Sequence, residues 1–173
     1  MADAYALRLE DVAEVTLAYS GQEALDLVDE GLVPDVVLLD RHMPGLSGDD
    51  VLDALRDRDV RTRVVMVTAI DPGLDILDLP FDDYLCKPVK RADIRAAVDQ
   101  QCQVLAYELL GEYFEDESKR AVLEAELPPD RLADHEEFAE LESRTQALEA
   151  RASRLLPVAS ESLDAFSWID RAQ

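Results

Sequence analysis

Three short apolar runs divide the first hundred residues of the chain, and a polar side chain stands at the end of each. Val36–Leu39 is followed by Asp40, Arg63–Thr68 ends in its own threonine, and Asp83–Cys86 is followed by Lys87. Runs of this length and composition are typical of strands buried on both faces of a parallel sheet. Because the carboxyl ends of parallel strands share one edge of a sheet, we expect these polar groups to lie together.

Segments with helical spacing lie between these runs. Residues 2–10, Gly21 to Asp29 and Asp49 to Arg58 place their apolar side chains on one helical face. Residues 69–80 contain two prolines and a glycine and predict only a stunted helix, whereas Val12 to Ala18 alternates like a strand. The succession of strands and helices predicts an α/β fold with a doubly wound parallel sheet.

From Lys90 onward the pattern is helical. A first helix extends to about Glu126, just before two consecutive prolines. A second helix follows Asp134, which with Glu137 three residues later predicts a capping box. A last short amphipathic helix is expected at Glu161 to Arg171. The pattern therefore predicts a C-terminal α-helical hairpin extension.

The second of these helices carries a heptad seam, with apolar or small residues at alternating gaps of three and four. The seam consists of Phe138, Leu141, Thr145, Leu148, Ala152 and Leu155. It is equally compatible with an intramolecular hairpin and an intermolecular coiled coil, because Thr145 and Ala152 weaken it. The pattern leaves open whether Phe166 and the only tryptophan, Trp168, contact the preceding domain or another chain.

The composition is that of an acidic protein large enough for a hydrophobic core. The 173 residues are 48% hydrophobic, which suffices for one full domain and a small appendage. The formal charge of −22 would repel a nucleic acid backbone or an anionic membrane. No run approaches a membrane span and no secretory leader is present, so we expect a cytoplasmic protein. Cys86 and Cys102 fit neither a disulfide framework nor a zinc spacing, and we expect packing roles for both.

A carboxylate, a hydroxyl and an ammonium group at neighbouring strand ends suit the capture of a phosphoryl group. Asp40 can attack phosphorus as a nucleophile, Lys87 can neutralise a phosphoryl oxygen, and Thr68 can hydrogen-bond to another. Such a reaction also calls for Mg²⁺, because a carboxylate and a phosphoryl group repel each other at contact. Taken singly, Asp40 is also explained as a loop cap, Lys87 as a surface charge and Thr68 as a strand-end packing residue.

Three segments together resemble the signature segments of two-component response-regulator receiver domains, in order and at suitable spacing. They are VVLLDRHMPGLSG, VVMVTA and DDYLCKPV. The resemblance implies a flavodoxin-like fold in which Asp40 is the phosphoacceptor, Thr68 is the switch hydroxyl and Lys87 faces the phosphate. It also implies that Tyr84 is a rotating aromatic residue and that the Lys87-Pro88 bond is cis.

The resemblance further implies a Mg²⁺ site formed by Asp40, the backbone carbonyl of His42 and a pair of acidic residues at the end of a first strand. This chain has neither that strand nor that pair, because Met1 falls where the first helix of the family is already under way. The site therefore lacks its principal carboxylates. Three nearby acidic residues do not occupy the matching position: Asp3, Asp11 and Asp71.

The missing strand would lie between Val12–Ala18 and Val36–Leu39, and its loss removes a row of backbone partners. Two explanations stay open. Either the sequence is truncated and the true start lies upstream of Met1, or Val12–Ala18 moves over to pair directly with Val36–Leu39. We favour the truncation of an ordinary receiver domain.

The region from about Leu105 onward resembles the HalX domain, a helical module attached to receivers in salt-loving archaea. The resemblance rests on YFEDESKRAVLEAEL and HEEFAELESR. We therefore expect a receiver domain over residues 1–103 and a HalX-like domain over residues 104–173. The second region contains 7 basic and 17 acidic residues, a net charge of −10, which argues against DNA contact.

The two resemblances together imply a response regulator. It would accept a phosphoryl group on Asp40 from a histidine kinase and signal through its helical module to a protein partner or by forming a homodimer. The alternative is a pseudo-receiver that takes no phosphate and acts as a constitutive interaction or dimerisation platform. We expect no enzyme: an aspartyl-phosphate phosphatase would need a second Asp two residues after the nucleophile, and His42 stands there.

The acidic residues are spread over the whole chain, so their mutual repulsion loosens the fold at ordinary ionic strength. At molar salt the screening length falls to about 3 Å and most of this repulsion disappears. We therefore predict a protein of a salt-accumulating organism, with a higher melting temperature in molar potassium chloride than in dilute buffer. Circular dichroism measures both temperatures. A higher value in dilute buffer would contradict the hypothesis.

Overall fold

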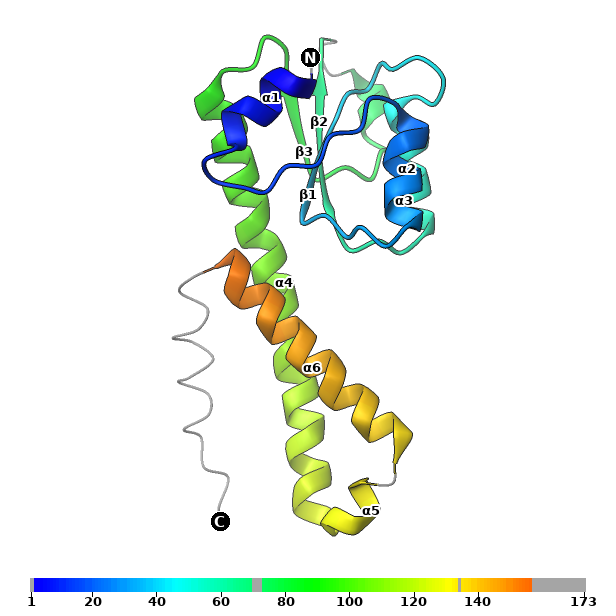
Figure 1. Ribbon diagram of the computed structural model, residues 1–173, viewed down its shortest axis with the longest axis vertical. Helices are drawn as coiled ribbons and strands as arrows, with labels where there is room; N and C mark the ends of the chain where they lie inside the picture. Colours follow the sequence, from blue (N-terminus) through cyan, green and yellow to red (C-terminus); the bar gives the residue numbers. More distant parts are fainter. Residues whose placement is uncertain (1, 70–72, 134, 157–173) are drawn as a thin grey trace. The chain divides into compact units, whose positions relative to one another are not determined.

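The computed structural model describes residues 2–69, 73–133 and 135–156, and the chain divides into two compact units, residues 1–102 and 103–173 (Figure 1). The first unit contains helices α1 (Ala2–Leu9), α2 (Gly21–Asp29) and α3 (Gly48–Asp57), strands β1 (Val36–Leu39), β2 (Arg63–Thr68) and β3 (Asp83–Cys86), and the 3₁₀ turn η1 (Leu74–Ile76). Helix α4 (Arg91–Glu126) begins in the first unit and continues in the second, which also contains α5 (Pro129–Ala133) and α6 (Glu136–Leu155). In the part of the chain that the structure describes, no helix combines the length and the apolar character that crossing a membrane requires.

The three strands form one parallel sheet in the order β1-β2-β3. Val37 of β1 pairs with Val64 of β2, and Met66 of β2 pairs with Tyr84 of β3. Strand β2 therefore has a hydrogen-bonded neighbour on each edge, and its residues from Val64 to Thr68 are buried. This burial on both faces explains why its sequence is a continuous apolar run.

Alternate side chains of β2 enter two hydrophobic cores, one on each face of the sheet. Val64 and Met66 pack with apolar residues of α2 and α3, whereas Val65 and Val67 pack with α1 and the start of α4. The division follows from the two-residue period of a strand. Helices thus cover both faces of a parallel sheet, and the predicted doubly wound α/β fold is confirmed.

Two expectations for the first unit are wrong. Val12–Ala18 is not a strand, and among the described residues β1 pairs with β2 alone, so the direct pairing of Val12–Ala18 with Val36–Leu39 does not occur. The alternation of apolar and polar side chains indicates that one face of the segment is buried. A β-strand also needs an adjacent strand to hydrogen-bond with its backbone groups. Cys86, at the end of β3, is exposed rather than packed in the core as expected, whereas Cys102 is half-buried.

The second unit contains a hairpin of α4 and α6 joined by an apolar seam. Leu148 and Ala152 of α6 are buried in one cluster with Leu105 and Leu109 of α4. Leu155 packs against the same cluster, so this half of the heptad has partners within the chain. Thr145, the polar member of the seam, is also buried and donates its hydroxyl hydrogen to the carbonyl of Leu141, one turn earlier.

The start of α6 differs in detail from the expectation. The residue that precedes the helix is His135, whose side chain makes no capping hydrogen bond. Asp134, the expected first member of the capping box, lies outside the described residues, as does the expected helix Glu161–Arg171 with Phe166 and Trp168.

An ion pair links α4 to α6. The side chain of Asp116 is only 5% exposed, and its two oxygens accept hydrogen bonds from Nε and Nη2 of Arg144 at 2.6 and 2.7 Å. This bidentate contact lowers the pKa of the Asp116 carboxyl below its usual range. Lys119 contributes a longer contact to the same carboxylate at 3.4 Å.

Replacing Arg144 with Met is expected to lower the free energy of unfolding by about 2 kcal/mol, because a buried carboxylate loses its main partner. The stabilisation by the Asp116–Arg144 pair is complete above about pH 3.9, the pKa of an aspartate in the unfolded chain. It is lost as the pH falls through the lowered pKa of Asp116 in the folded chain. The difference between Arg144→Met and the parent chain should therefore shrink from pH 7 to pH 3 in urea unfolding. Asp29→Asn, which removes an exposed pair with Arg58, is the control and should change little. Equal losses in both variants would contradict the assignment.

Candidate functional site

The polar groups at the ends of the three strands meet at one edge of the sheet. Lys87, which follows β3, donates a hydrogen bond from Nζ to Oδ2 of Asp40 at 2.5 Å, across an interval of 47 residues. The backbone N–H of Lys87 donates to the carbonyl of Thr68 at 2.7 Å. Strand β2 lies between β1 and β3. The side chains of Asp40 and Lys87 therefore meet across the end of β2.

The two charged groups of this site differ in their exposure. The side chain of Asp40 is 31% exposed, whereas that of Lys87 is 12% exposed. The carboxylate therefore remains open to a reagent from solvent, while the ammonium group is held beside it with little freedom. Thr68, the last residue of the central strand, is 1% exposed.

The loop after Asp40 is folded back onto the end of β1. The backbone N–H of His42 donates to Oδ1 of Asp40 at 3.2 Å, while the imidazole of His42 is exposed. Gly45 has a φ of +84°, a conformation that favours glycine. The loop closes where the N–H of Gly48 donates to the carbonyl of Arg41 at 2.9 Å.

Gly48, the first residue of α3, lies directly against the backbone of Asp40 and Arg41. A Cβ at this position would lie 2.4 Å from the backbone oxygen of Asp40 and 2.7 Å from Cα of Arg41. The loop can therefore approach α3 this closely only with glycine there. Ser47 caps the same helix, because its hydroxyl accepts from the N–H of Asp50 while the Asp50 carboxylate accepts from the N–H of Ser47.

An ion pair between Arg41 and Asp49 was also not foreseen. The Arg41 guanidinium donates from Nε and Nη2 to the carboxylate of Asp49, with contacts of 3.1 to 3.2 Å. It ties the residue after Asp40 to the first turn of α3. The two residues are eight positions apart and a turn separates them. This spacing matches neither the helical nor the strand period, so the sequence pattern does not predict the pair.

Tyr84 and the Lys87-Pro88 bond were expected from the receiver resemblance. The Lys87-Pro88 bond is cis, as expected. The ring of Tyr84 is half-buried beside the core that includes Met66, and its centroid lies 5.6 Å from that of Phe81 at an interplanar angle of 52°. The rotation of Tyr84 stays a prediction.

The residues near Asp40 do not form a Mg²⁺ site on their own. Both oxygens of Asp40 are engaged, and no group of three or more His, Cys, Asp and Glu side chains within residues 2–69, 73–133 and 135–156 could hold a metal ion. Asp3 accepts a hydrogen bond from the hydroxyl of Tyr19, and Asp11 pairs with two arginines of α4. Asp71 lies outside the described residues. We therefore assign no chemical step to a metal.

A second charged cluster lies at the opposite ends of the strands and has a structural role. Asp82, which precedes β3, accepts from the backbone N–H of Val64 at 2.6 Å and pairs with Arg56 and Arg63 at 2.8 and 3.1 Å. Arg56 also donates to the carbonyl oxygens of Thr62 and Pro80. These bonds hold the connections to β2 and β3 in place, and no carboxylate of the cluster is left for other chemistry.

Comparisons with known proteins match each unit to a family. The sequence profile of the response regulator receiver domain matches residues 3–99, and that of the HalX domain matches residues 103–167. The two matched segments adjoin at residues 99–103, close to the boundary between the two compact units after residue 102.

Curated relatives carry names of gene regulators. A protein of Haloferax volcanii, provisionally named a transcriptional regulator, is 41% identical over 137 residues, which are 79% of this chain and 23% of the relative. The nitrate/nitrite response regulator NarL of Escherichia coli is 29% identical over 150 residues, which are 85% of this chain and 66% of NarL. The chain thus spans less than two thirds of the length of either protein.

Solved structures of receiver domains share the fold. The receiver domain of Francisella response regulator 1452 is 30% identical with a TM-score of 0.53, and the match covers 58% of this chain and 85% of that domain. The Vibrio cholerae chemotaxis protein CheY4 is 22% identical with a TM-score of 0.51, covers 57% of this chain and 86% of its own, and supports the fold alone.

Gly48→Ala is predicted to destabilise the first unit by about 2 kcal/mol, because the new Cβ would overlap the backbone of Asp40 and Arg41. The matched control is Gly111→Ala, where a Cβ meets nothing within 4 Å inside helix α4. That change should instead stabilise the helix by up to about 1 kcal/mol. Thermal unfolding of both variants measures the difference. A neutral Gly48→Ala would refute the close approach.

Proposed function

Because the chain belongs to the response regulator receiver family and continues into a HalX domain, we propose that it accepts a phosphoryl group on Asp40 from a phosphohistidine of a histidine kinase. The observation that carries this proposal is the contact between the Asp40 carboxylate, at the end of β1, and the Lys87 ammonium, at the end of β3. A nucleophile and a fixed positive charge at one sheet edge are the two groups that phosphoryl capture needs first.

In the proposed reaction an oxygen of Asp40 attacks the phosphorus atom of the phosphohistidine. A P–O bond forms as the P–N bond breaks, and the imidazole leaves with the electron pair and takes a proton from solvent. Lys87 stays protonated and exchanges its contact with Asp40 for one with a phosphoryl oxygen. The hydroxyl of Thr68 then donates to a second phosphoryl oxygen, and Tyr84 turns inward behind it.

The helical second unit is the proposed output of this switch. Its net charge of −10 disfavours direct binding to DNA, so we propose that it acts through a protein partner, either another helical protein or a second copy of the chain. The names of the relatives describe longer proteins, of which this chain covers between 23% and 66% in the two cases above. Any role in transcription would therefore be exerted through that partner.

A second candidate is a pseudo-receiver that takes no phosphate and acts as a constitutive interaction or dimerisation platform. One observation favours it: both oxygens of Asp40 are engaged, and the described residues supply no cluster of metal ligands beside it. Receiver domains as a family bind Mg²⁺ at the phosphorylation site, where this chain offers Asp40 and the backbone carbonyl of His42. The two candidates therefore make different predictions for the reaction with a small phosphodonor.

We predict that acetyl phosphate or phosphoramidate labels the chain on Asp40 as an acyl phosphate that hydroxylamine removes. Intact mass spectrometry follows the addition of one phosphoryl group at several Mg²⁺ concentrations. Asp40→Asn should abolish the product, and Lys87→Met should lower its yield by about tenfold or more, because the phosphoryl charge loses its partner.

Asp49→Asn serves as the matched control, since it removes a neighbouring carboxylate that contacts Arg41 and leaves Asp40 in place. It should retain most of the labelling. No acyl phosphate at any Mg²⁺ concentration, in a chain whose circular dichroism shows it folded, would favour the pseudo-receiver.

A further inference from the structure

A stripe of uncharged residues runs along α4 on the side away from Leu105 and Leu109, which pack against α6. Successive residues of a helix are about 100° apart around its axis. Between residues 103 and 125, all eight charged residues of α4 lie outside one sector about 100° wide. We call the residues within that sector the α4 stripe: Gln103, Val104, Tyr107, Gly111, Phe114, Ser118, Ala121, Val122 and Ala125.

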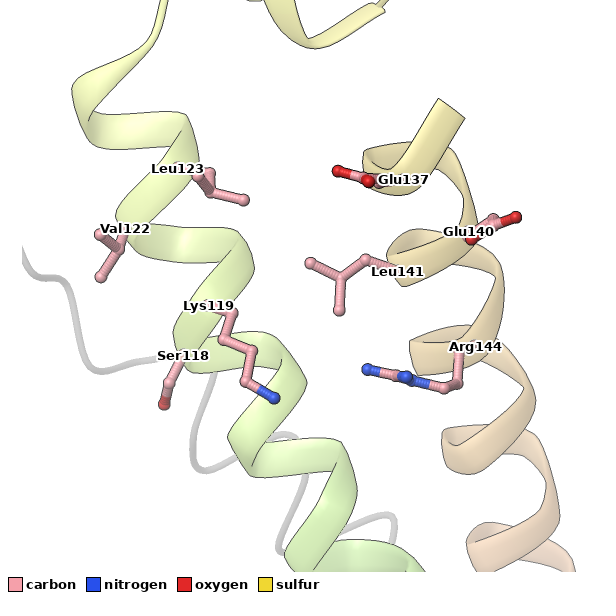
Figure 2. Close-up of a pocket in the computed structure, with 8 residues that line it drawn as sticks. All are labelled: Ser118, Lys119, Val122, Leu123, Glu137, Glu140, Leu141 and Arg144. Carbon is pink, nitrogen blue, oxygen red and sulfur yellow. The ribbon is translucent and has the colours of Figure 1, made fainter. Parts of the chain in front are cut away.

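Most residues of the α4 stripe are exposed. Figure 2 shows Ser118 and Val122 directed away from α6, whereas Leu123 points toward Leu141 across the groove between the two helices. Tyr107 and Val122 are 64% and 57% exposed. The solvent side of a helix ordinarily carries charged residues, and 32% of this chain is charged. An exposed side without charge therefore marks a surface for contact with another protein.

We propose that the α4 stripe pairs with the same stripe of a second copy of the chain, with the two helices antiparallel. This proposal names the partner of the helical output and rests on the proposed function for its role in signalling. Each copy has a formal charge of −22, so contact between most surfaces of two copies brings carboxylates together. Two α4 stripes meet without burying a carboxylate, which avoids the desolvation of unpaired charges.

The α4 stripe has the spacing of a helix pair. Seven of its residues follow one another at alternating gaps of three and four, as in a heptad seam. They are Val104, Tyr107, Gly111, Phe114, Ser118, Ala121 and Ala125. This seam lies on the other side of α4 from the leucines that pack against α6, so α4 can contact a second copy while the hairpin stays intact.

The order of large and small residues favours the antiparallel direction. When the axis of symmetry passes midway between Phe114 and Ser118, each Phe114 lies opposite Ser118 of the second copy, and each Tyr107 lies opposite Ala125. Every aromatic ring of the seam then faces a small side chain. In a parallel pair each residue lies opposite its own counterpart, so rings meet rings and Gly111 meets Gly111. That arrangement packs unevenly and leaves voids.

The acidic residues beside the α4 stripe make the pairing dependent on salt. Glu115 flanks the stripe close to the axis of symmetry, where it approaches Glu115 of the second copy. At molar salt the screening length falls to about 3 Å and this repulsion is largely removed. The seam is short and contains several small residues, so we expect weak association in the micromolar range.

Sedimentation velocity of the full chain over a range of micromolar concentrations tests the pairing. We expect a reversible dimer in molar potassium chloride and a dissociation constant higher by about tenfold or more in dilute buffer. Ser118→Glu should raise the dissociation constant in molar salt by about tenfold or more, because a carboxylate then faces Phe114 of the second copy. Ser143→Glu makes the same change at an exposed serine of α6 and should leave the constant unaltered. Glu115→Gln should lower the constant in dilute buffer several-fold.

Cysteine pairs test the direction of the helices. Along α4, positions 107 and 125 are about 27 Å apart, so cysteines there cannot bond within one chain. In a chain with Cys86→Ser and Cys102→Ser, we expect Tyr107→Cys together with Ala125→Cys to give disulfide-linked dimers when copper phenanthroline is the oxidant. Either change alone should leave the chain unlinked.

Two results would overturn the proposal: a chain that stays monomeric at every concentration in molar potassium chloride, and linked dimers formed by Tyr107→Cys alone, which would show parallel helices. Labelling of Asp40 by acetyl phosphate is measured on the same samples and should persist in Ser118→Glu. A chain that is labelled but monomeric contradicts the pairing alone. A chain that dimerises without labelling contradicts phosphoryl capture and supports the pairing.

Discussion

The pairing of β2 with a parallel neighbour on each edge is the constraint on which the rest of the first unit depends. Its backbone bonds fix the end of β1 and the end of β3 on either side of Thr68. Asp40 and Lys87 are therefore neighbours because of the backbone register. A slip of one residue would turn Val64 and Met66 to the other face, so the two cores in turn hold that register.

The two ends of the sheet show how similar groups serve different purposes. At one end Asp82 accepts from a backbone N–H and two guanidinium groups and is fully occupied by the fold. At the other end Asp40 is 31% exposed and contacts one ammonium group and one backbone N–H. Asp40 is thus more accessible to solvent and has fewer partners than Asp82, although both residues are aspartates.

The central strand could be predicted with its bounds because burial on both faces leaves a continuous apolar run, as in Arg63–Thr68. Val12–Ala18 was predicted wrongly because its alternation is a property of side chains, while strand formation depends on a backbone partner elsewhere in the chain. The contact of Asp40 with Lys87 follows from parallel strands. The close approach at Gly48 does not, because it depends on how the loop meets α3 in space.

In the described part of the chain, β1 offers the backbone groups of its outer edge without a strand beside it. Such an edge is a template on which another copy can add a strand, and short length and net charge are two ways by which proteins discourage this. β1 has four residues, and the formal charge of −22 makes copies repel one another. Concentrated salt shields that repulsion between molecules as much as within them. Concentrated salt thus weakens the electrostatic barrier to edge-to-edge association, whereas the shortness of β1 opposes it at any ionic strength.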